Sequence, residues 1–308
     1  MKHLFIINPA AGKKNQSEEF EKKIAAYCDA KGMDYAVKIS AHKGNCTELA
    51  RAAAESGEEY RIYACGGDGT LNEIVNGVVG YSNVAITHFP GGSGNDFIRM
   101  FTQPEAFRDL SRLMEGEEAL IDTISVCDEM YALNTCSMGI DARIGTEIAR
   151  YKRIPGISGS GAYNLSTVIN VIKGIHSPYE VDIDGKTIKG NQTLICICNG
   201  QYYGGGFNPV PDARPDDGLL DVLIICPVSR LTVAKVVGKY KAGLYKDFPD
   251  LITHYRVPTL TIRTPKESVI SVDGESLWKQ EATFSVSPHK VRFFYPRGTS
   301  YIKDSEKI

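Results

Sequence analysis

Residues 63–73, YACGGDGTLNE, place three glycines around an aspartate where a strand gives way to a helix. The aromatic and β-branched run 60–64 predicts the strand, and 71–79 predicts the helix. Glycine permits positive φ and lets other groups approach the main chain, and the first turn of a helix offers N–H groups that bind anions. A tight turn would explain the glycines but not the acid between them. The stretch therefore predicts a phosphate-binding turn with a carboxylate beside it.

Strands and helices alternate along the first 120 or so residues. This alternation predicts a parallel α/β sheet covered by helices. A second glycine turn, 91–94, directly follows the expected strand 84–89. Ligands of such sheets bind at the carboxyl ends of the strands, so we expect both glycine turns at one binding edge.

The pattern changes after Asp122, where short strands are separated by turn pairs such as Asp184-Gly185 and Asp273-Gly274. These strands, which include 131–138, 259–264 and 269–272, predict a mostly antiparallel β-sandwich or barrel. Helical stretches at about 141–176 and 229–246 interrupt them. A chain of 308 residues suits two domains.

Composition excludes several classes of protein. Hydrophobic content of 43% and charged content of 23% are those of an ordinary globular chain, and a net charge of −2 argues against a nucleic-acid binder. The eight cysteines have no zinc-site spacing, which favours reduced thiols in the cytosol. The apolar run at the N-terminus predicts a first strand rather than a signal peptide, and no stretch is long enough to cross a bilayer.

Basic residues are concentrated in two segments, 143–176 and 227–247, each with a net charge of +4. Such segments are usually solvated helix faces. The alternative is reversible contact with an anionic membrane surface, for which Lys235, Lys239 and Lys246 are the candidate residues. The sequence leaves both interpretations open.

The motifs of several phosphate-binding families are missing. The chain has no Walker A loop, no HRD or DFG element of protein kinases, and no GxGxxG of dinucleotide-binding folds. What remains is a phosphate-binding domain with acids near it.

Six motifs in a fixed order carry a resemblance to a known family. Besides Gly66-Gly67-Asp68-Gly69-Thr70 with Asn72-Glu73, they are Asn8-Pro9-Ala10-Ala11-Gly12-Lys13, Gly92-Ser93-Gly94-Asn95-Asp96-Phe97-Ile98-Arg99, Gly204-Gly205-Gly206-Phe207, Asp217-Gly218-Leu219-Leu220-Asp221 and Val272-Asp273-Gly274-Glu275. Together they resemble the diacylglycerol kinase catalytic superfamily, which includes sphingosine kinases and soluble bacterial lipid kinases. The third motif departs from the family pattern at Ser93, where threonine is usual, and at Ile98, where alanine is usual.

The resemblance implies a nucleotide-binding α/β domain and a β-sandwich domain for the lipid, with the active site in the cleft between them. We expect the first domain to span 1–124 with a returning tail at about 295–308, and the second to span 125–294. The resemblance also implies ATP and Mg²⁺ as cofactors.

The nucleotide contacts implied by the resemblance lie mostly in the first glycine turn. They are Gly66, Gly67, Asp68, Gly69, Thr70, Leu71 and Asn72, together with Ser40, Ser93 and Asn95. Ser40 is the weaker member, because a serine after a strand is more often a simple turn residue.

A metal site is implied at the late DDG segment. The resemblance assigns Mg²⁺ to Asp217 and to the main-chain carbonyls of Arg214 and Leu219, and oxygen ligands suit this ion. Asp68, Asp96 and Asp122 resemble the acids that connect to the site from the first domain. Asp216 is the competing carboxylate.

Two acids flank Gly274 in the last motif. An Asp-Gly pair is also a common hairpin turn, and the residues alone favour that interpretation. The resemblance instead implies that Glu275 is the base that accepts the proton of the lipid hydroxyl, with Asp273 orienting it or holding metal.

The leading prediction is an ATP-dependent lipid kinase, with diacylglycerol as the expected substrate and phosphatidic acid as product. The alternatives are an NAD kinase-like phosphotransferase and a catalytically inactive nucleotide- or lipid-binding regulator. Phosphatidylglycerol and sphingoid bases present similar hydroxyls, so the lipid stays open, as does the choice between monomer and homodimer. We expect a cytoplasmic protein at the inner face of the membrane that binds no nucleic acid.

Overall fold

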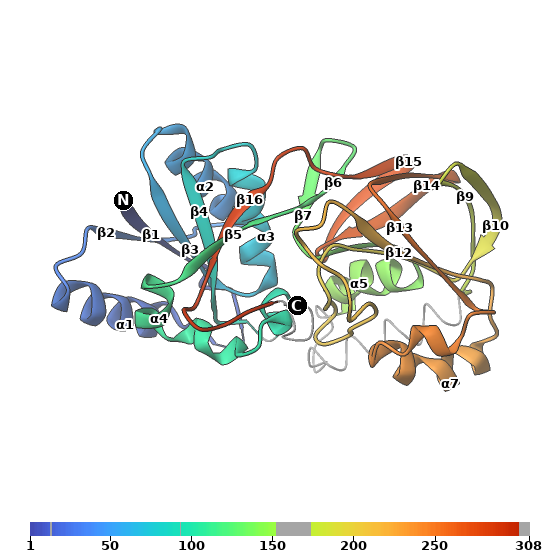
Figure 1. The fold of residues 1–308 in the computed structure, drawn as a ribbon, viewed down its shortest axis with the longest axis horizontal. Coiled ribbons are helices and arrows are strands. Elements are labelled where there is room, and N and C mark those ends of the chain that lie inside the picture. Colours follow the sequence, from blue (N-terminus) through green and yellow to red (C-terminus); the bar gives the residue numbers. More distant parts are fainter. Residues whose placement is uncertain (13, 93, 152–173, 302–308) are drawn as a thin grey trace. The chain divides into compact units, whose positions relative to one another are not determined.

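The computed structural model describes residues 1–301 except 13, 93 and 152–173 (Figure 1). The chain forms two compact units. The first comprises Met1–Thr123, Tyr203–Gly206 and the chain from Ser287 onward, and the second comprises Ile124–Tyr202 and Phe207–Val286. The return to the first unit therefore begins at Ser287, earlier than the expected 295, because the strand Val291–Tyr295 completes the first sheet instead of the second.

The first unit is built on a six-stranded sheet. In spatial order its strands are β2 (Tyr35–Ile39), β1 (Lys2–Ile7), β3 (Tyr60–Gly66), β4 (Val84–Pro90), β16 (Val291–Tyr295) and β5 (Glu117–Ile121). Five of these strands run parallel, and β5 pairs antiparallel with β16. The chain leaves β1 toward β2 and then returns to the other side of β1, so the strand order reverses between β1 and β3. Ligands of open α/β sheets bind at such a reversal.

Helices connect these strands. They are α1 (Ser17–Ala30), α2 (Asn45–Glu55), α3 (Asp68–Val78), the 3₁₀ segments Phe97–Met100 and Pro104–Arg108, and α4 (Leu110–Met114). The helix after the first glycine turn begins at Asp68, three residues before the expected start. Gly67 is its N-cap in an extended conformation, so Asp68, Gly69 and Thr70 form the first helical turn rather than a loop.

The returning strand β16 is held by aromatic packing on both faces of the sheet. Phe294 lies edge-on to Tyr63 with ring centroids 5.0 Å apart, and Phe293 lies edge-on to Phe97 at 5.1 Å. Both phenylalanines are fully buried. Side chains on a strand alternate between faces, so this single strand contributes to the apolar layers above and below the sheet.

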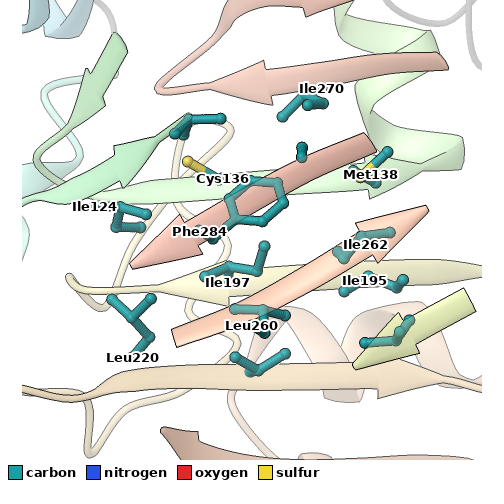
Figure 2. Packing of buried hydrophobic residues seen from close by; sticks show 14 of the residues in the cluster. Ile124, Cys136, Met138, Ile195, Ile197, Leu220, Leu260, Ile262, Ile270 and Phe284 are labelled. Carbon is teal, nitrogen blue, oxygen red and sulfur yellow. The ribbon is translucent and has the colours of Figure 1, made fainter. Parts of the chain in front are cut away.

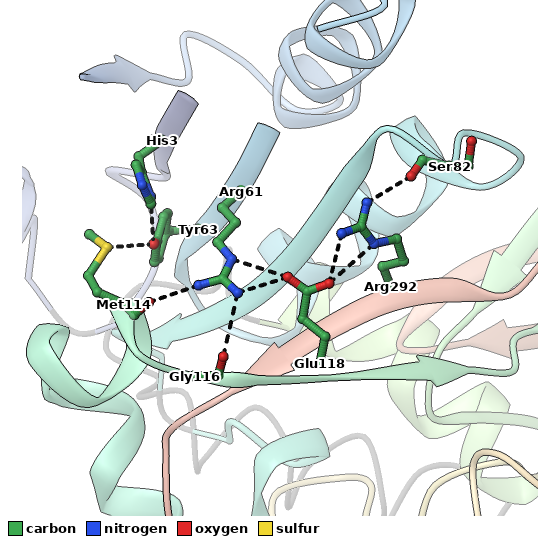
Figure 3. A network of polar contacts seen from close by, with 8 residues as sticks. All are labelled: His3, Arg61, Tyr63, Ser82, Met114, Gly116, Glu118 and Arg292. Atoms are coloured by element: carbon green, nitrogen blue, oxygen red, sulfur yellow. Dashed lines mark hydrogen bonds and ion pairs between the residues drawn. The ribbon is translucent and has the colours of Figure 1, made fainter. Parts of the chain in front are cut away.

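Charge also fixes β16 in the sheet, through a carboxylate between two arginines (Figure 3). Glu118 on β5 accepts hydrogen bonds from Arg61 on β3 at 2.8 and 3.2 Å and from Arg292 on β16 at the same two distances. Arg61 is buried and also donates to the Met114 carbonyl at 2.9 Å. Burial raises the pKa of Glu118, but the hydrogen bonds from the two arginines outweigh it and hold that pKa below its ordinary value.

The second unit is an antiparallel assembly. Its main sheet runs β13 (Ile252–Val257), β12 (Leu220–Ile225), β11 (Leu194–Cys198), β8 (Thr135–Gly139), β14 (Thr259–Val272), β15 (Glu275–Val286), β6 (Ile124–Val126) and β7 (Met130–Ala132), and β9 (Ser177–Ile183) with β10 (Lys186–Gln192) joins at β14. The helices α5 (Ile140–Tyr151) and α7 (Arg230–Lys241) and the 3₁₀ turn Tyr245–Asp247 complete the described part.

One long strand organises this unit. The first half of β14 pairs with β9 and the second half with β8, and an irregularity between Arg263 and Ser268 separates the halves. A bulge bends a strand and increases its twist, so β14 turns the sheet over a shared core (Figure 2). That core contains Phe284, Ile262, Ile270 and Ile197, all fully buried.

Several expected elements differ from the structure. The segments 259–264 and 269–272 are parts of one strand, and 131–138 is divided into β7 and β8. Strands β5, β10 and β13 were missed because they are edge strands that keep many polar side chains in solvent, so they lack a clear apolar pattern. Most of the expected helix 141–176 lies outside the described residues.

We expect Glu118→Gln to destabilise the first unit by about 1–2 kcal/mol, because a neutral acceptor binds the two arginines less strongly than a carboxylate. The pKa of Glu118 is lowered on folding, so its contribution is complete above the unfolded value of 4.5 and is lost as the pH falls toward the folded value. Urea unfolding at about pH 7 and about pH 3 measures both effects.

The matched control is Glu115→Gln, which removes an exposed ion pair with Arg297. We expect it to change stability by less than about 0.5 kcal/mol at either pH. A loss in Glu118→Gln that is equally large at both pH values would contradict the assigned role of the charge.

Candidate active site

The two glycine turns meet main chain to main chain at the carboxyl ends of β3 and β4. The Gly66 carbonyl accepts the N–H groups of Gly91 at 2.8 Å and Gly92 at 3.1 Å. A Cβ atom added to Gly92 would lie 2.5 Å from the Gly67 Cα atom, and one added to Gly66 would lie 2.2 Å from the Thr70 hydroxyl. Only glycine allows this approach, and the structure confirms that the two turns share one edge.

His88 supports the same carbonyl from inside the sheet. Its Nε2 atom lies 2.9 Å from the Gly66 oxygen, and because a carbonyl only accepts, Nε2 carries the proton. The side chain is fully buried, and burial lowers its pKa, so the ring is neutral at physiological pH. An isolated histidine in an apolar strand carries no sequence signal of such a contact, so this role of His88 could not be predicted.

A third loop, which follows β1, joins these turns. Asn8 donates from its side chain to the Thr70 hydroxyl at 3.0 Å, and Gln16 donates to the Gly91 carbonyl at 2.9 Å. A Cβ atom on Gly12 would lie 2.6 Å from that same carbonyl oxygen. Loops from three adjacent strands therefore converge where the strand order reverses.

The first turn of α3 is the candidate anion-binding element of this edge. The N–H groups of Thr70 and Leu71 bond to the Gly67 carbonyl, whereas those of Asp68 and Gly69 stand too early in the helix to have a helical partner. A Cβ atom added to Gly69 would meet no heavy atom within 4 Å. This combination of N–H donors and open space suits a phosphate group.

Two acids stand beside that helix end. The Asp68 carboxylate accepts the Asp96 N–H at 2.5 Å, and the Asp96 carboxylate accepts the Gly205 N–H at 2.7 Å. The glycine-rich segment at 204–206 is thereby attached to the first unit through Asp96. Burial and the neighbouring Asp68 charge raise the pKa of Asp96, while Arg99, 3.1 Å away, partly compensates.

The remaining nucleotide candidates lie near this edge with distinct local partners. Asn95 has a φ of +51° and donates to the Gly92 carbonyl at 2.9 Å, so it shapes the second turn. Ser40 is buried, with its N–H bonded to the Ile7 carbonyl at 2.8 Å. Leu71 and Asn72 are buried on α3. Ser93 and Lys13 lie outside the described residues.

Glu73, noted only as part of a motif, has a structural role in the first unit. Its carboxylate accepts the N–H groups of Gly44 at 3.0 Å and Cys46 at 3.1 Å. These groups lie at the start of α2, so a side chain from α3 caps the neighbouring helix. The contact fixes α2 against α3.

Asp122, the third expected acid of the first unit, is fully buried and lies 2.9 Å from the Lys290 ammonium group. Lys290 comes from the returning segment, and the Ser287 N–H bonds to the Thr123 carbonyl at 2.8 Å. The ion pair therefore lies at the point where the returning chain joins the first unit.

The expected metal residues of the second unit also have a basic partner. Asp217 accepts the Leu219 N–H at 3.0 Å and forms an ion pair with Arg256 on β13. Burial raises the pKa of Asp217, against the opposing effects of these two partners. The competing carboxylate, Asp216, is paired with Arg214 at 3.2 Å.

The acids of the last motif have different environments. The Asp273 carboxylate accepts the consecutive N–H groups of Leu133 at 2.7 Å, Asn134 at 3.2 Å and Thr135 at 2.7 Å. Asp273 itself has a φ of +48° in the β14–β15 turn. Glu275 follows as the half-buried first residue of β15, paired in register with Val272. Asp273 thus anchors the turn that presents Glu275.

Among the carboxylates expected to bind metal, Asp68 and Asp96 suit a divalent cation better than Asp217 does. Asp68 and Asp96 could supply oxygen ligands in the first unit, where burial and the Asp68 charge raise the pKa of Asp96 although Arg99 lies 3.1 Å away. The group formed by Arg214, Asp217 and Leu219 fits a metal only if Arg256 withdraws from Asp217. Among the described residues, no three aspartate, glutamate, histidine or cysteine side chains converge.

Two models of known protein domains match the chain. The model of the diacylglycerol kinase catalytic domain matches residues 2–126, and that of the YegS C-terminal NAD kinase beta sandwich-like domain matches residues 134–295. The chain belongs to the diacylglycerol kinase family. Both the family and the two-part fold expected from the sequence are confirmed.

Individual relatives agree with this assignment. A Staphylococcus epidermidis protein named "Putative lipid kinase" is 26% identical over 261 residues, which cover 83% of this chain and 84% of the relative. A Staphylococcus aureus protein of the same name is 26% identical over 233 residues, 75% of each chain. A solved Bacillus anthracis structure titled a "putative diacylglycerol kinase" has the same fold, with a TM-score of 0.74 at 24% identity over 96% of this chain and 97% of that one.

In this diacylglycerol kinase family member, we expect Gly92→Ala to separate the glycine turns and to destabilise the first unit by about 1–3 kcal/mol, because the added Cβ would collide with the Gly67 main chain. Gly69→Ala is the matched control, since its Cβ enters open space at a helical position. Thermal unfolding should show no loss of stability for Gly69→Ala. The affinity of this variant for ATP should nevertheless fall at least tenfold if a phosphate group occupies the open space at Gly69. Equal stability of the two variants would contradict the packing argument.

A second expectation concerns Asp273→Asn, which keeps the shape of the side chain but removes the charge that three N–H groups bind. We expect a loss of about 1.5–3 kcal/mol in the unfolding free energy of the second unit. Asp184→Asn is the control, because Asp184-Gly185 is an exposed turn with a similar φ of +51°. Chemical denaturation of both variants measures the difference, and equal losses would show that turn geometry alone matters.

Proposed function

We propose that the protein is an ATP-dependent lipid kinase that transfers the γ-phosphoryl group of ATP to a hydroxyl of a membrane lipid, with diacylglycerol as substrate and phosphatidic acid as product. The observation that carries the proposal is the joined pair of glycine turns with open space at Gly69, next to Asp68 and Asp96. Membership of a lipid kinase family supports this interpretation of the site.

The first unit has the features needed to seat phosphates. Phosphoryl transfer depends mainly on positioning and on charge stabilisation. The Asp68 and Gly69 N–H groups would bind phosphate oxygens, and the turn 91–95 holds this element in place through the Gly66 carbonyl. When bound, Mg²⁺ would neutralise charge on the transferred group, with Asp68 and Asp96 as its ligands in this unit.

Glu275 is the proposed proton acceptor. The lipid hydroxyl oxygen forms a bond to the γ-phosphorus while the bond to the β–γ bridging oxygen breaks, ADP leaves, and the hydroxyl proton passes to the Glu275 carboxylate. Asp273 is less suited to this step, because both of its oxygens already accept main-chain N–H groups. Its proposed part is to position the turn that carries Glu275.

The alternative functions predict different behaviour. An NAD kinase-like enzyme would phosphorylate NAD in place of a lipid, and an inactive regulator would bind ATP or lipid without turnover. The chain retains Asp68, Asp217 and Glu275, which favours an active kinase over the regulator. None of the described helices is long and apolar enough to cross a membrane. We propose that the enzyme reaches its lipid by reversible contact with the inner membrane surface.

We expect Glu275→Gln to retain its fold and ATP binding but to lose about 10²–10⁴-fold in turnover, since the variant cannot accept the hydroxyl proton. Labelled ATP with diacylglycerol, phosphatidylglycerol, a sphingoid base and NAD as separate acceptors tests both the base and the substrate class. Glu281→Gln is the control, as it removes the same charge from the exposed part of β15. The base assignment fails if the two variants turn over diacylglycerol equally, and the proposed function fails if the parent phosphorylates only NAD.

A further inference from the structure

Among the described residues, helix α7 in the second unit is covered on only one of its faces. Val233 packs against Ile140, Ile144 and Ile175, and Tyr240 is the one fully covered side chain of the helix. The Ser229 hydroxyl accepts the Thr232 N–H at 3.1 Å, which caps the helix start. The helix is thus fixed to the unit by its inner face, and its outer face is in solvent.

That outer face carries large apolar side chains. Leu231 is 75% exposed and Val237 is 41% exposed, and Leu244 just after the helix is 46% exposed. Single exposed apolar residues are common, but these three fall within 14 residues of one exposed element. Nothing in the inner packing of the helix explains them.

Lys235 lies on the same side of the helix as Leu231, whereas Val237, one turn from the inner residue Val233, lies at the edge of the exposed face. Helical spacing places Lys235 one turn from Leu231 and Lys241 one turn from Val237, and the small residues Ala234 and Gly238 lie between the two pairs. No acidic residue occurs from Arg230 to Lys246. The outer face is therefore basic and apolar together.

The structure separates the lysines that are available from those that are not. Lys239 lies 3.5 Å from Asp247, and Lys246 lies 2.9 Å from Asp212 in a 3₁₀ turn beyond the helix. Lys246 is therefore not on the helix face that the sequence suggested. Lys235 and Lys241 have no acidic partner among the described residues. Lys241 lies over the Phe207 ring at 5.2 Å, a contact that leaves its charge unneutralised.

We propose that α7 is a membrane-contact element that binds anionic lipid bilayers, with Leu231 entering the interface and Lys235 and Lys241, on its two sides, facing lipid phosphates. Apolar residues interspersed with lysines on one helix face are typical of helices that lie in the membrane interface. A nucleic acid would match the charge but would give no reason for Leu231 to be exposed. The proposal rests on the proposed function, because it identifies where a lipid kinase meets its substrate's membrane.

Vesicle co-sedimentation of the full chain tests the surface directly. We expect the parent to bind vesicles of phosphatidylcholine and phosphatidylglycerol much more tightly than pure phosphatidylcholine, and less tightly at high salt. The double variant Lys235→Gln/Lys241→Gln should weaken binding to the anionic vesicles roughly tenfold or more. Leu231→Gln should weaken it roughly tenfold at both low and high salt, because it removes apolar insertion rather than charge.

Two controls match these changes in exposure and charge. Lys246→Gln removes a lysine that is already paired, and Leu120→Gln replaces a leucine of the first unit that is 57% exposed. Both controls should bind like the parent. The proposal is overturned if the parent shows no preference for anionic vesicles, if the α7 variants bind like the controls, or if the parent binds a DNA duplex better than anionic vesicles.

An activity measurement separates this inference from the proposed function. With a short-chain diacylglycerol dissolved as monomers, the α7 variants should turn over at the parent rate, and with the same lipid class in anionic vesicles they should lose activity in parallel with binding. If the parent phosphorylates no lipid in either form, the proposed function fails, while the sedimentation result still decides the role of α7. Equal losses with monomeric and vesicular substrate would overturn the membrane role.

Discussion

The first unit depends on the contact between two main-chain segments at the Gly66 carbonyl. That oxygen accepts two N–H groups from the turn after β4 and one from His88, so one atom fixes the end of β3, the end of β4 and the start of α3. A side chain at Gly66 or Gly92 would prevent the contact. The same contact sets the direction of α3, and the free N–H groups at the start of that helix are what can bind a phosphate.

The two glycine turns keep their positions only if the first sheet is intact. That sheet is completed by β16, near the C-terminal end of the chain. β16 lies between β4 and β5, and Glu118 ties it to β3 through Arg61 and Arg292. The second unit is therefore an insertion between β5 and β16 in the sequence of the first. A chain that stopped before Ser287 would leave β4 as an edge strand and remove the aromatic contact between Phe97 and Phe293.

Much of this arrangement follows from local sequence signals. The glycine turns directly after strands, the alternation of strands and helices, and the Asp-Gly turns each depend on short-range conformational preferences, which a single sequence displays. The same signals could not give the partners of buried charges. Arg256 lies 39 residues from Asp217 and Lys290 lies 168 residues from Asp122, and no local pattern links such pairs. Asp273 shows the same limit: its turn was predictable, but its three N–H partners come from residues 133–135.

Three of the carboxylates expected to surround a metal each have a basic partner in their own unit. Asp96 lies near Arg99, Asp122 near Lys290 and Asp217 near Arg256, each pair within one unit. A buried carboxylate without a counter-charge is costly, and these basic groups offset part of that cost. A cation arriving with a nucleotide would have to compete with Arg256 at Asp217 and with Arg99 at Asp96, but beside Asp96 it would also relieve the repulsion from the Asp68 carboxylate. This repulsion lies next to the start of α3, the helix end that we propose as the phosphate-binding element.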